Sequence, residues 1–136
     1  MKKIGIVVSE FNPEITAKML SHALSHAEKL GFKAERVIKV PGAFDMPLAI
    51  KALLAQSDIE GVATLGAIIT GETSHDEVIA AALAKTIHDL QLQFNKPVSL
   101  GVSGPGMTEK QAKERAEEYA KRSVEALAKM LAALEK

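Results

Sequence analysis

The chain has 136 residues, with 17 basic and 17 acidic side chains and no cysteine. That length predicts a single domain over residues 1–136 that can bury a sizeable core. The balanced charge argues against nucleic acid or a membrane as a partner, and the lack of cysteine excludes disulfides, thiolate nucleophiles and cysteine-based metal sites. No apolar run approaches the length of a membrane span. The first expected strand begins at Lys3 and leaves no room for a signal peptide, so we expect a cytoplasmic protein.

Strand and helix signals alternate along the first half of the chain. The short apolar run at residues 4–8 is typical of a strand that is buried on both faces. Pro13 opens a helix that is expected to end near Leu30, before a glycine. Residues 33–40 predict a second strand, nearer an edge of the sheet, and residues 46–56 a shorter helix.

The second half of the chain repeats this alternation. Residues 61–69 predict a third strand, residues 75–94 a long helix and residues 97–102 a fourth strand. Ser103–Gly106 contains two glycines and a proline and is expected to be a loop. From Thr108 onward the composition is strongly helical to the end of the chain, with a candidate break at residues 117–119.

Four strand–helix units predict an α/β fold, a three-layer sandwich in which helices flank a four-stranded parallel sheet, doubly wound and flavodoxin-like. In such sheets ligands bind beyond the carboxyl ends of the strands, where the strand order reverses. Four loops are expected to share that rim, at residues 9–12, 41–45, 70–74 and 103–107. The unusual residues of the sequence concentrate in these loops, which predicts a functional site there.

Two aromatic residues lie in the rim loops. Phe11 directly follows the first strand, where it either stacks on a flat heterocycle or packs against the next helix as a hydrophobic staple. Phe44 lies in the segment 41–47, where Gly42 allows a ligand to approach the backbone. Asp45 in the same segment either accepts hydrogen bonds from ligand hydroxyls or caps the helix that begins at the next residue.

The third rim loop leads from a strand into the first turn of a helix at His75. A helix N-terminus presents free backbone N–H groups and the positive end of a dipole, which suits a phosphate. Histidine transfers protons near neutral pH. Ser74 and Glu77 fit a capping box, which assigns no capping role to His75.

The negative charges of Glu72, Asp76 and Glu77 oppose the binding of a phosphate at this helix terminus unless a cation is brought in. Arg115, on the last helix, is the candidate because a guanidinium binds phosphate through a planar, bidentate fork. The alternative is that Arg115 is solvated or paired with a glutamate at helical spacing.

Two further patterns are weaker indications of function. His22 and His26 have the i, i+4 spacing of a metal-chelating pair, but no third ligand accompanies them, so packed or solvated histidines are the better interpretation. Residues 101–106 are rich in glycine like a nucleotide-binding loop, but Pro105 and the missing lysine disagree with the known patterns.

Taken together, five segments resemble lumazine synthase, an enzyme family of riboflavin biosynthesis, and in particular its archaeal branch. The segments follow the family's order and spacing and cover nearly the whole chain: residues 7–12, 40–47, 65–77, 96–108 and 111–115. Each segment is weak alone, but the set is specific.

The resemblance implies the condensation of 5-amino-6-ribitylaminouracil with 3,4-dihydroxy-2-butanone 4-phosphate to 6,7-dimethyl-8-ribityllumazine, phosphate and water. It also implies that Phe11 stacks on the pyrimidine ring and that Asp45 helps to hold the ribityl chain. The other residues that it implies for the ribityl chain and the ring pocket are Ala43, Phe44, Ala67, Ile68 and Ile69. No cofactor, metal or protein nucleophile is expected, because the reaction needs proton transfer and positioning, and one substrate supplies the amine.

For the phosphate-bearing substrate, the resemblance implies backbone and hydroxyl contacts from Gly71, Glu72 and Thr73. Arg115 would come from a neighbouring subunit, and His75 would shuttle protons. The family forms pentamers that share active sites between subunits, and many members assemble into icosahedral shells. We therefore expect a homopentamer that builds a 60-subunit shell, with riboflavin synthase as a candidate partner.

Three positions depart from the pattern of bacterial members. Asp45 is one methylene shorter than the usual glutamate, and Thr70 replaces a basic residue. Leu100 replaces an aromatic residue that would face the substrate ring from the neighbouring subunit. Two alternatives stay open, a non-catalytic module that binds lumazine or flavin and an engineered self-assembling shell protein, with which the repetitive tail after Ser123 is compatible.

Overall fold

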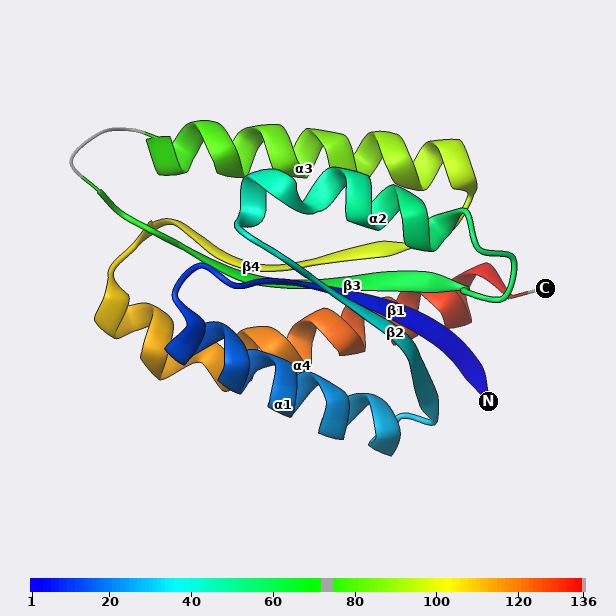
Figure 1. The fold of residues 1–136 in the computed structure, drawn as a ribbon. Helices are drawn as coiled ribbons and strands as arrows, with labels where there is room; N and C mark the ends of the chain where they lie inside the picture. The colour runs from blue at the N-terminus through cyan, green and yellow to red at the C-terminus, as the bar shows by residue number, and fades with distance from the viewer. Residues whose placement is uncertain (72–74, 136) are drawn as a thin grey trace.

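The computed structural model describes residues 1–71 and 75–135. A parallel sheet lies between two layers of helices (Figure 1). The strands are β1 (Lys2–Ser9), β2 (Phe32–Val40), β3 (Gly61–Ile69) and β4 (Val98–Met107). The helices are α1 (Pro13–Lys29), α2 (Met46–Leu54), α3 (His75–Phe94) and α4 (Glu109–Leu134), and a 3-10 turn, η1 (Ala43–Asp45), precedes α2.

The four strands pair in the order β2-β1-β3-β4, and all pairs are parallel. The fold class expected from the sequence is therefore confirmed, as is the position of β2 at an edge. After β1 the chain crosses to β2 on one side, whereas after β3 it crosses to β4 on the other side. The direction of winding thus reverses between β1 and β3, and this is the place where a doubly wound sheet opens a crevice.

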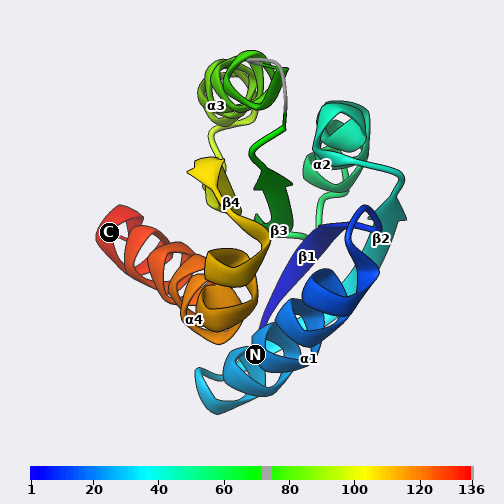
Figure 2. The same ribbon diagram turned by 90° about the vertical axis from the view of Figure 1, so that its left-hand side faces the viewer.

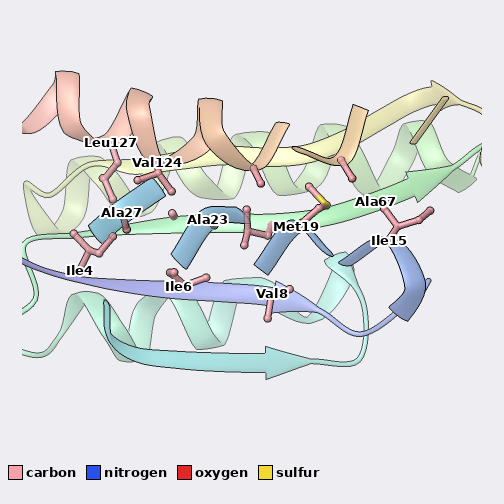
Figure 3. Packing of buried hydrophobic residues seen from close by; sticks show 14 of the residues in the cluster. Ile4, Ile6, Val8, Ile15, Met19, Ala23, Ala27, Ala67, Val124 and Leu127 are labelled. Atoms are coloured by element: carbon pink, nitrogen blue, oxygen red, sulfur yellow. The ribbon is translucent and has the colours of Figure 1, made fainter. Parts of the chain in front are cut away.

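Helices cover both faces of the sheet. Figure 2 shows α1 and α4 together on one face and α2 and α3 on the other. The side chains of β1 alternate between the two cores, as expected for a strand. Ile4, Ile6 and Val8 pack with Met19 of α1 on the first face (Figure 3), and Val7 packs into the core beneath α2 and α3.

The two histidines of α1 contact glutamates of α4. His26 Nε2 lies 2.8 Å from Glu125 Oε1, and His22 Nδ1 lies 3.4 Å from Glu117 Oε1. The i, i+4 spacing therefore places both rings at the contact between two helices. In residues 1–71 and 75–135, no three histidine, aspartate or glutamate side chains are arranged to hold a metal ion.

The prediction of a loop at residues 103–106 is wrong, because β4 continues through this segment to Met107. Ser103 pairs with Ala67, and Met107 pairs with Ile69 after an irregularity in the register. Glycine and proline are poor strand formers, which is why the sequence predicts a loop here. However, β4 is an edge strand, and a proline without an N–H group is tolerated in an edge strand.

The candidate break at residues 117–119 is also wrong, because α4 is one helix over Glu109–Leu134. Two ion pairs at i, i+4 spacing span this region, Lys121–Glu117 at 3.4 Å and Arg122–Glu118 at 3.2 Å. Such pairs add support to a continuous helix. None of the helices in the described parts of the chain is both long and apolar enough to cross a membrane.

Candidate active site

A cavity of about 500 Å³ lies at the carboxyl ends of β1 and β3, between the beginnings of α2 and α3. Figure 2 views the molecule from this end of the sheet. The cavity thus occupies the point where the winding of the sheet reverses, as expected for a ligand site in this fold. It is lined by Phe11, Pro41, Gly42, Ala43, Phe44, Asp45, Ala67, Ile68, Ile69, Gly71, His75, Asp76 and Ile79.

The mouth of this cavity carries two exposed aromatic side chains. Phe11 is 63% exposed and Phe44 is 75% exposed. A staple packed against α1 would bury much of the Phe11 ring, so the exposure favours the ligand-stacking interpretation of Phe11 over the staple.

The floor of the cavity comes from the end of β3. Ala67 and Ile68 are 3% and 7% exposed, and Ile69 is partly buried. β3 is buried along its length because helices cover both faces of the sheet. Only its last residues reach the carboxyl end of the sheet, where the cavity lies. The floor is therefore apolar, and polar groups reach the cavity from the loops around it.

Asp45 does not cap α2 with its side chain. Its carboxylate oxygen Oδ2 instead accepts a hydrogen bond of 3.1 Å from the Gly42 N–H, which caps the 3-10 turn η1 that precedes α2. This corrects the helix-capping alternative. A carboxylate has about four lone-pair directions, so one backbone hydrogen bond leaves Asp45 able to accept further bonds from a ligand.

His75 and Asp76 are the first two residues of α3, and both line the cavity. His75 is exposed, whereas Asp76 is only 7% exposed. The Gly106 N–H of β4 donates a hydrogen bond of 3.1 Å to Asp76 Oδ2. From the sequence, Asp76 was considered only as a negative charge, and its contact with β4 was not predicted. Its place in the first turn of a helix, next to a candidate catalytic histidine, was the one signal in the sequence that could have pointed to this residue.

Leu100 and Arg115 are outside the cavity. Leu100 lies on the edge strand β4 and is 50% exposed. Arg115 lies on α4, on the opposite face of the sheet, where it is exposed and makes no ion pair with the other described residues. Of the residues expected to bind phosphate, Gly71 lines the cavity, and Glu72 and Thr73 lie outside the described residues, as does Ser74 of the expected capping box.

The charged groups of the cavity are unbalanced. Its described lining contains two carboxylates, Asp45 and Asp76, and no lysine or arginine. A phosphate in this cavity therefore needs a cation that the described lining does not supply. A second, smaller cavity of about 360 Å³ lies between α1 and β2 and contains none of the candidate site residues.

The fold and the cavity define a class of protein: a doubly wound α/β protein with a cavity of small-molecule size at its topological switch point, lined by aromatic rings and a histidine. Comparison of the sequence with known families makes the assignment specific. The profile of the 6,7-dimethyl-8-ribityllumazine synthase family matches residues 1–135, and the chain belongs to this family.

Several relatives that carry this name come from archaea. The protein from Metallosphaera sedula is 58% identical over 128 residues, which cover 94% of this chain and 85% of the relative. The protein from Staphylothermus marinus is 53% identical over 131 residues, which cover 96% and 87%. The protein from Saccharolobus solfataricus is 57% identical over 129 residues, which cover 95% and 84%.

These relatives confirm the resemblance inferred from the sequence motifs. They support a transferase of riboflavin biosynthesis, and they support neither a non-catalytic binding module nor an engineered shell protein.

Proposed function

We propose that the cavity at the switch point is where this chain condenses 5-amino-6-ribitylaminouracil with 3,4-dihydroxy-2-butanone 4-phosphate to form 6,7-dimethyl-8-ribityllumazine. The observation that carries the proposal is the meeting of Phe11, Asp45 and His75 in one cavity. They come from three separate segments, the loop after β1, the turn η1 and the first turn of α3, and each has a chemical property that the reaction uses.

In this proposal the pyrimidine substrate lies between the loop after β1 and the end of β3. The Phe11 ring stacks on the flat heterocycle, and the apolar floor of Ala67, Ile68 and Ile69 excludes water beneath it. The ribityl chain extends along Ala43, Phe44 and Asp45. The Asp45 carboxylate accepts hydrogen bonds from the hydroxyls of the ribityl chain. The hydrogen bond from the Gly42 N–H holds this carboxylate in place.

His75 transfers the protons of the reaction. Imine formation, phosphate elimination and ring closure each need a proton added or removed, and the substrate amine is the nucleophile. A histidine suits this role because its charge changes near neutral pH. His75 lies at the cavity on the first turn of α3, within the group of residues that we assign to the substrates.

The phosphate group binds near Gly71, with Glu72 and Thr73, and a neighbouring subunit supplies Arg115. The lack of a cation in the described lining supports this arrangement, as does the exposed position of Arg115 on the opposite face of its own sheet. The same neighbour brings Leu100 to the substrate ring from its edge strand.

We further propose that the chain forms a homopentamer that assembles into an icosahedral 60-subunit shell in the cytoplasm, with riboflavin synthase as a partner. Exposed apolar side chains near the cavity support contact with another copy, because such surface is costly in water. Leu48 on α2 is 78% exposed, and Val78 on α3 is 64% exposed.

A two-substrate assay that follows the absorbance of the lumazine product tests the proposal. The wild-type protein should form the product from both substrates together and from neither alone. His75→Ala should assemble like the wild type and lose roughly 10²–10⁴-fold in turnover, the usual contribution of a general acid–base group. Wild-type turnover by His75→Ala would remove His75 from the mechanism, and no product from the wild type would contradict the assignment of the cavity.

A further inference from the structure

Asp76 combines deep burial with a negative charge at the edge of the cavity. It is only 7% exposed, and a buried carboxylate is costly unless its oxygens are hydrogen-bonded. Two features compensate for the burial. Oδ2 accepts the hydrogen bond from the Gly106 N–H, and the carboxylate lies at the positive end of the α3 dipole.

The part of β4 that Asp76 contacts is itself fixed to β3. The Thr70 N–H donates a hydrogen bond of 2.8 Å to the Met107 carbonyl, and an added Cβ at Gly104 would lie 2.4 Å from the Ile68 carbonyl oxygen. Gly106 has φ +75°, a conformation that glycine adopts without strain. Asp76 therefore bonds to a backbone N–H group whose position is set by the sheet.

This contact joins the first turn of α3 to β4. Neighbouring residues of an α-helix point about 100° apart around its axis. Asp76 points into the molecule toward β4, and His75 is exposed at the cavity. The first turn of a helix lacks hydrogen-bond partners for its N–H groups and frays readily, so a side-chain contact from this turn to the sheet opposes fraying where His75 is attached.

We propose that Asp76 is a positioning residue, whose hydrogen bond with the backbone of Gly106 fixes the first turn of α3 and thereby holds His75 at the cavity. This inference rests on the proposed role of His75 in proton transfer. In this inference the Asp76 carboxylate is the hydrogen-bond acceptor for β4, whereas the sequence indicated only that its charge opposes phosphate binding.

Three substitutions test the proposal in the assembled protein. Asp76→Ala removes the acceptor and should lower kcat by roughly 10- to 100-fold, the cost of a small misplacement of a catalytic group, while the KM of both substrates stays unchanged. Asp76→Asn keeps an oxygen that can accept the Gly106 N–H and should retain most of kcat. Asp89→Ala removes an exposed aspartate near the other end of α3 and should behave like the wild type.

Hydrogen–deuterium exchange at the Gly106 amide measures the contact independently of catalysis. Exchange should be faster in Asp76→Ala than in the wild type, because the amide has lost its acceptor. Asp76→Asn and Asp89→Ala should protect this amide as the wild type does.

The proposal is overturned if Asp76→Ala keeps wild-type kcat although Gly106 exchanges faster. It is also overturned if Asp76→Asn loses as much activity as Asp76→Ala, because charge and not the hydrogen bond would then matter. Should Asp76→Ala fail to fold, Asp76→Glu answers the question, since it keeps the carboxylate but displaces it by one methylene. Because the longer side chain can still reach the Gly106 N–H, the exchange of this amide is measured in the same variant, and kcat should fall only if that exchange becomes faster. A wild-type kcat with faster exchange, or a lowered kcat with wild-type exchange, contradicts the proposal.

His75→Ala, measured in parallel, separates this inference from the proposed function. If His75→Ala is fully active, the role of His75 itself fails, whatever the Asp76 variants show. If His75→Ala is inactive and Asp76→Ala is fully active, only the positioning role fails.

Discussion

At the scale of single residues, the two phenylalanines at the mouth of the cavity are unusual for a chain with four phenylalanines, one tyrosine and no tryptophan. Phe11 and Phe44 are both mostly exposed, whereas Phe32 lies in the core. Aromatic rings have more contact surface to offer than most side chains, so exposing two of them beside one cavity is best explained by a partner that covers them. We assign that partner as the pyrimidine substrate and, for Phe44, its ribityl chain.

Phe11→Ala should weaken binding of the pyrimidine substrate and leave binding of the phosphate-bearing substrate nearly unchanged. Stacking acts only on the flat ring, and base–aromatic stacking contributes about 1–3 kcal/mol, which corresponds to a roughly 5- to 150-fold rise in Kd. Calorimetric titration of each substrate alone measures the two affinities.

Leu92→Ala provides the control for Phe11→Ala, because Leu92 is a large, exposed apolar residue that does not line this cavity. It should leave both affinities at the wild-type level. An equal loss for the two substrates in Phe11→Ala would return Phe11 to the hydrophobic-staple role that sequence reasoning left open.

At the scale of secondary-structure elements, a buried hydroxyl cluster joins β3, β4 and α4. The Thr64 hydroxyl donates to the Ser99 carbonyl at 2.7 Å and accepts from the Gly101 N–H at 3.1 Å. The Ser123 hydroxyl donates to the Thr64 carbonyl at 3.0 Å and lies 2.7 Å from the Ser99 hydroxyl. These small side chains let α4 approach β3 and β4 closely.

Gly101→Ala should destabilise the protein for this reason. A Cβ at Gly101 would lie 2.2 Å from the Thr64 carbonyl oxygen and 2.5 Å from Ser123 Cβ, and at least the first of these is backbone that cannot move freely. Overpacking of this kind costs about 1–3 kcal/mol in the free energy of unfolding. Chemical denaturation followed by circular dichroism measures the change.

Gly42→Ala is the matched control for stability, because its added Cβ would meet no atom closer than 3.7 Å. We expect it to unfold at the wild-type denaturant concentration or slightly above, since replacing glycine restricts the unfolded chain. Equal midpoints for the two alanine variants would show that α4 and β4 can move apart without cost.

At the scale of the whole molecule, the described lining of the cavity lacks a group that the proposed reaction needs. It brings together the residues assigned to the pyrimidine and to proton transfer, but its described lining offers no cation to the phosphate group. Arg115 and Leu100 lie on surfaces away from it. A second copy of the chain that presents these surfaces to the cavity would complete the site, and the same contact would cover exposed apolar side chains.

Substitutions of Arg115 should affect the phosphate-bearing substrate most. Arg115→Lys keeps the charge but not the bidentate fork, so it should retain part of the affinity. Arg115→Ala should lose at least about tenfold, because hydrogen bonds to charged groups contribute about 1.5–3 kcal/mol. Titration of the phosphate-bearing substrate measures the effect. Arg122→Ala, on the same helix, is the control, since Arg122 already pairs with Glu118, and it should bind like the wild type.

Mixed assemblies test whether two subunits share each site. Co-assembly of His75→Ala and Arg115→Ala chains in equal amounts should make about one quarter of the subunit junctions intact, because each junction needs one wild-type group from each side. The activity of the mixture should therefore exceed that of either variant alone. Verified mixed assemblies without activity would place Arg115 and His75 in the same subunit's site or in none.

The sequence by itself determined the fold class and most of the cavity. Its apolar runs and helical periods predict four strand–helix units, and parallel strands end at one shared edge. The segments that lead from these strand ends into the next helices therefore meet there. Phe11, Asp45 and His75 were predicted to lie together for this reason, and the structure places all three in one cavity.

Only the tertiary structure shows the features that depend on contacts between residues far apart in the sequence. β4 extends through a segment rich in glycine and proline because β3 pairs with it to Met107, and no local propensity reports that pairing. Asp76 and Gly106 are 30 residues apart, so their hydrogen bond exists only once α3 and β4 have docked on the same sheet. Local sequence encodes the backbone preferences of each element, whereas the contacts between elements form only when burial of the shared core brings them together.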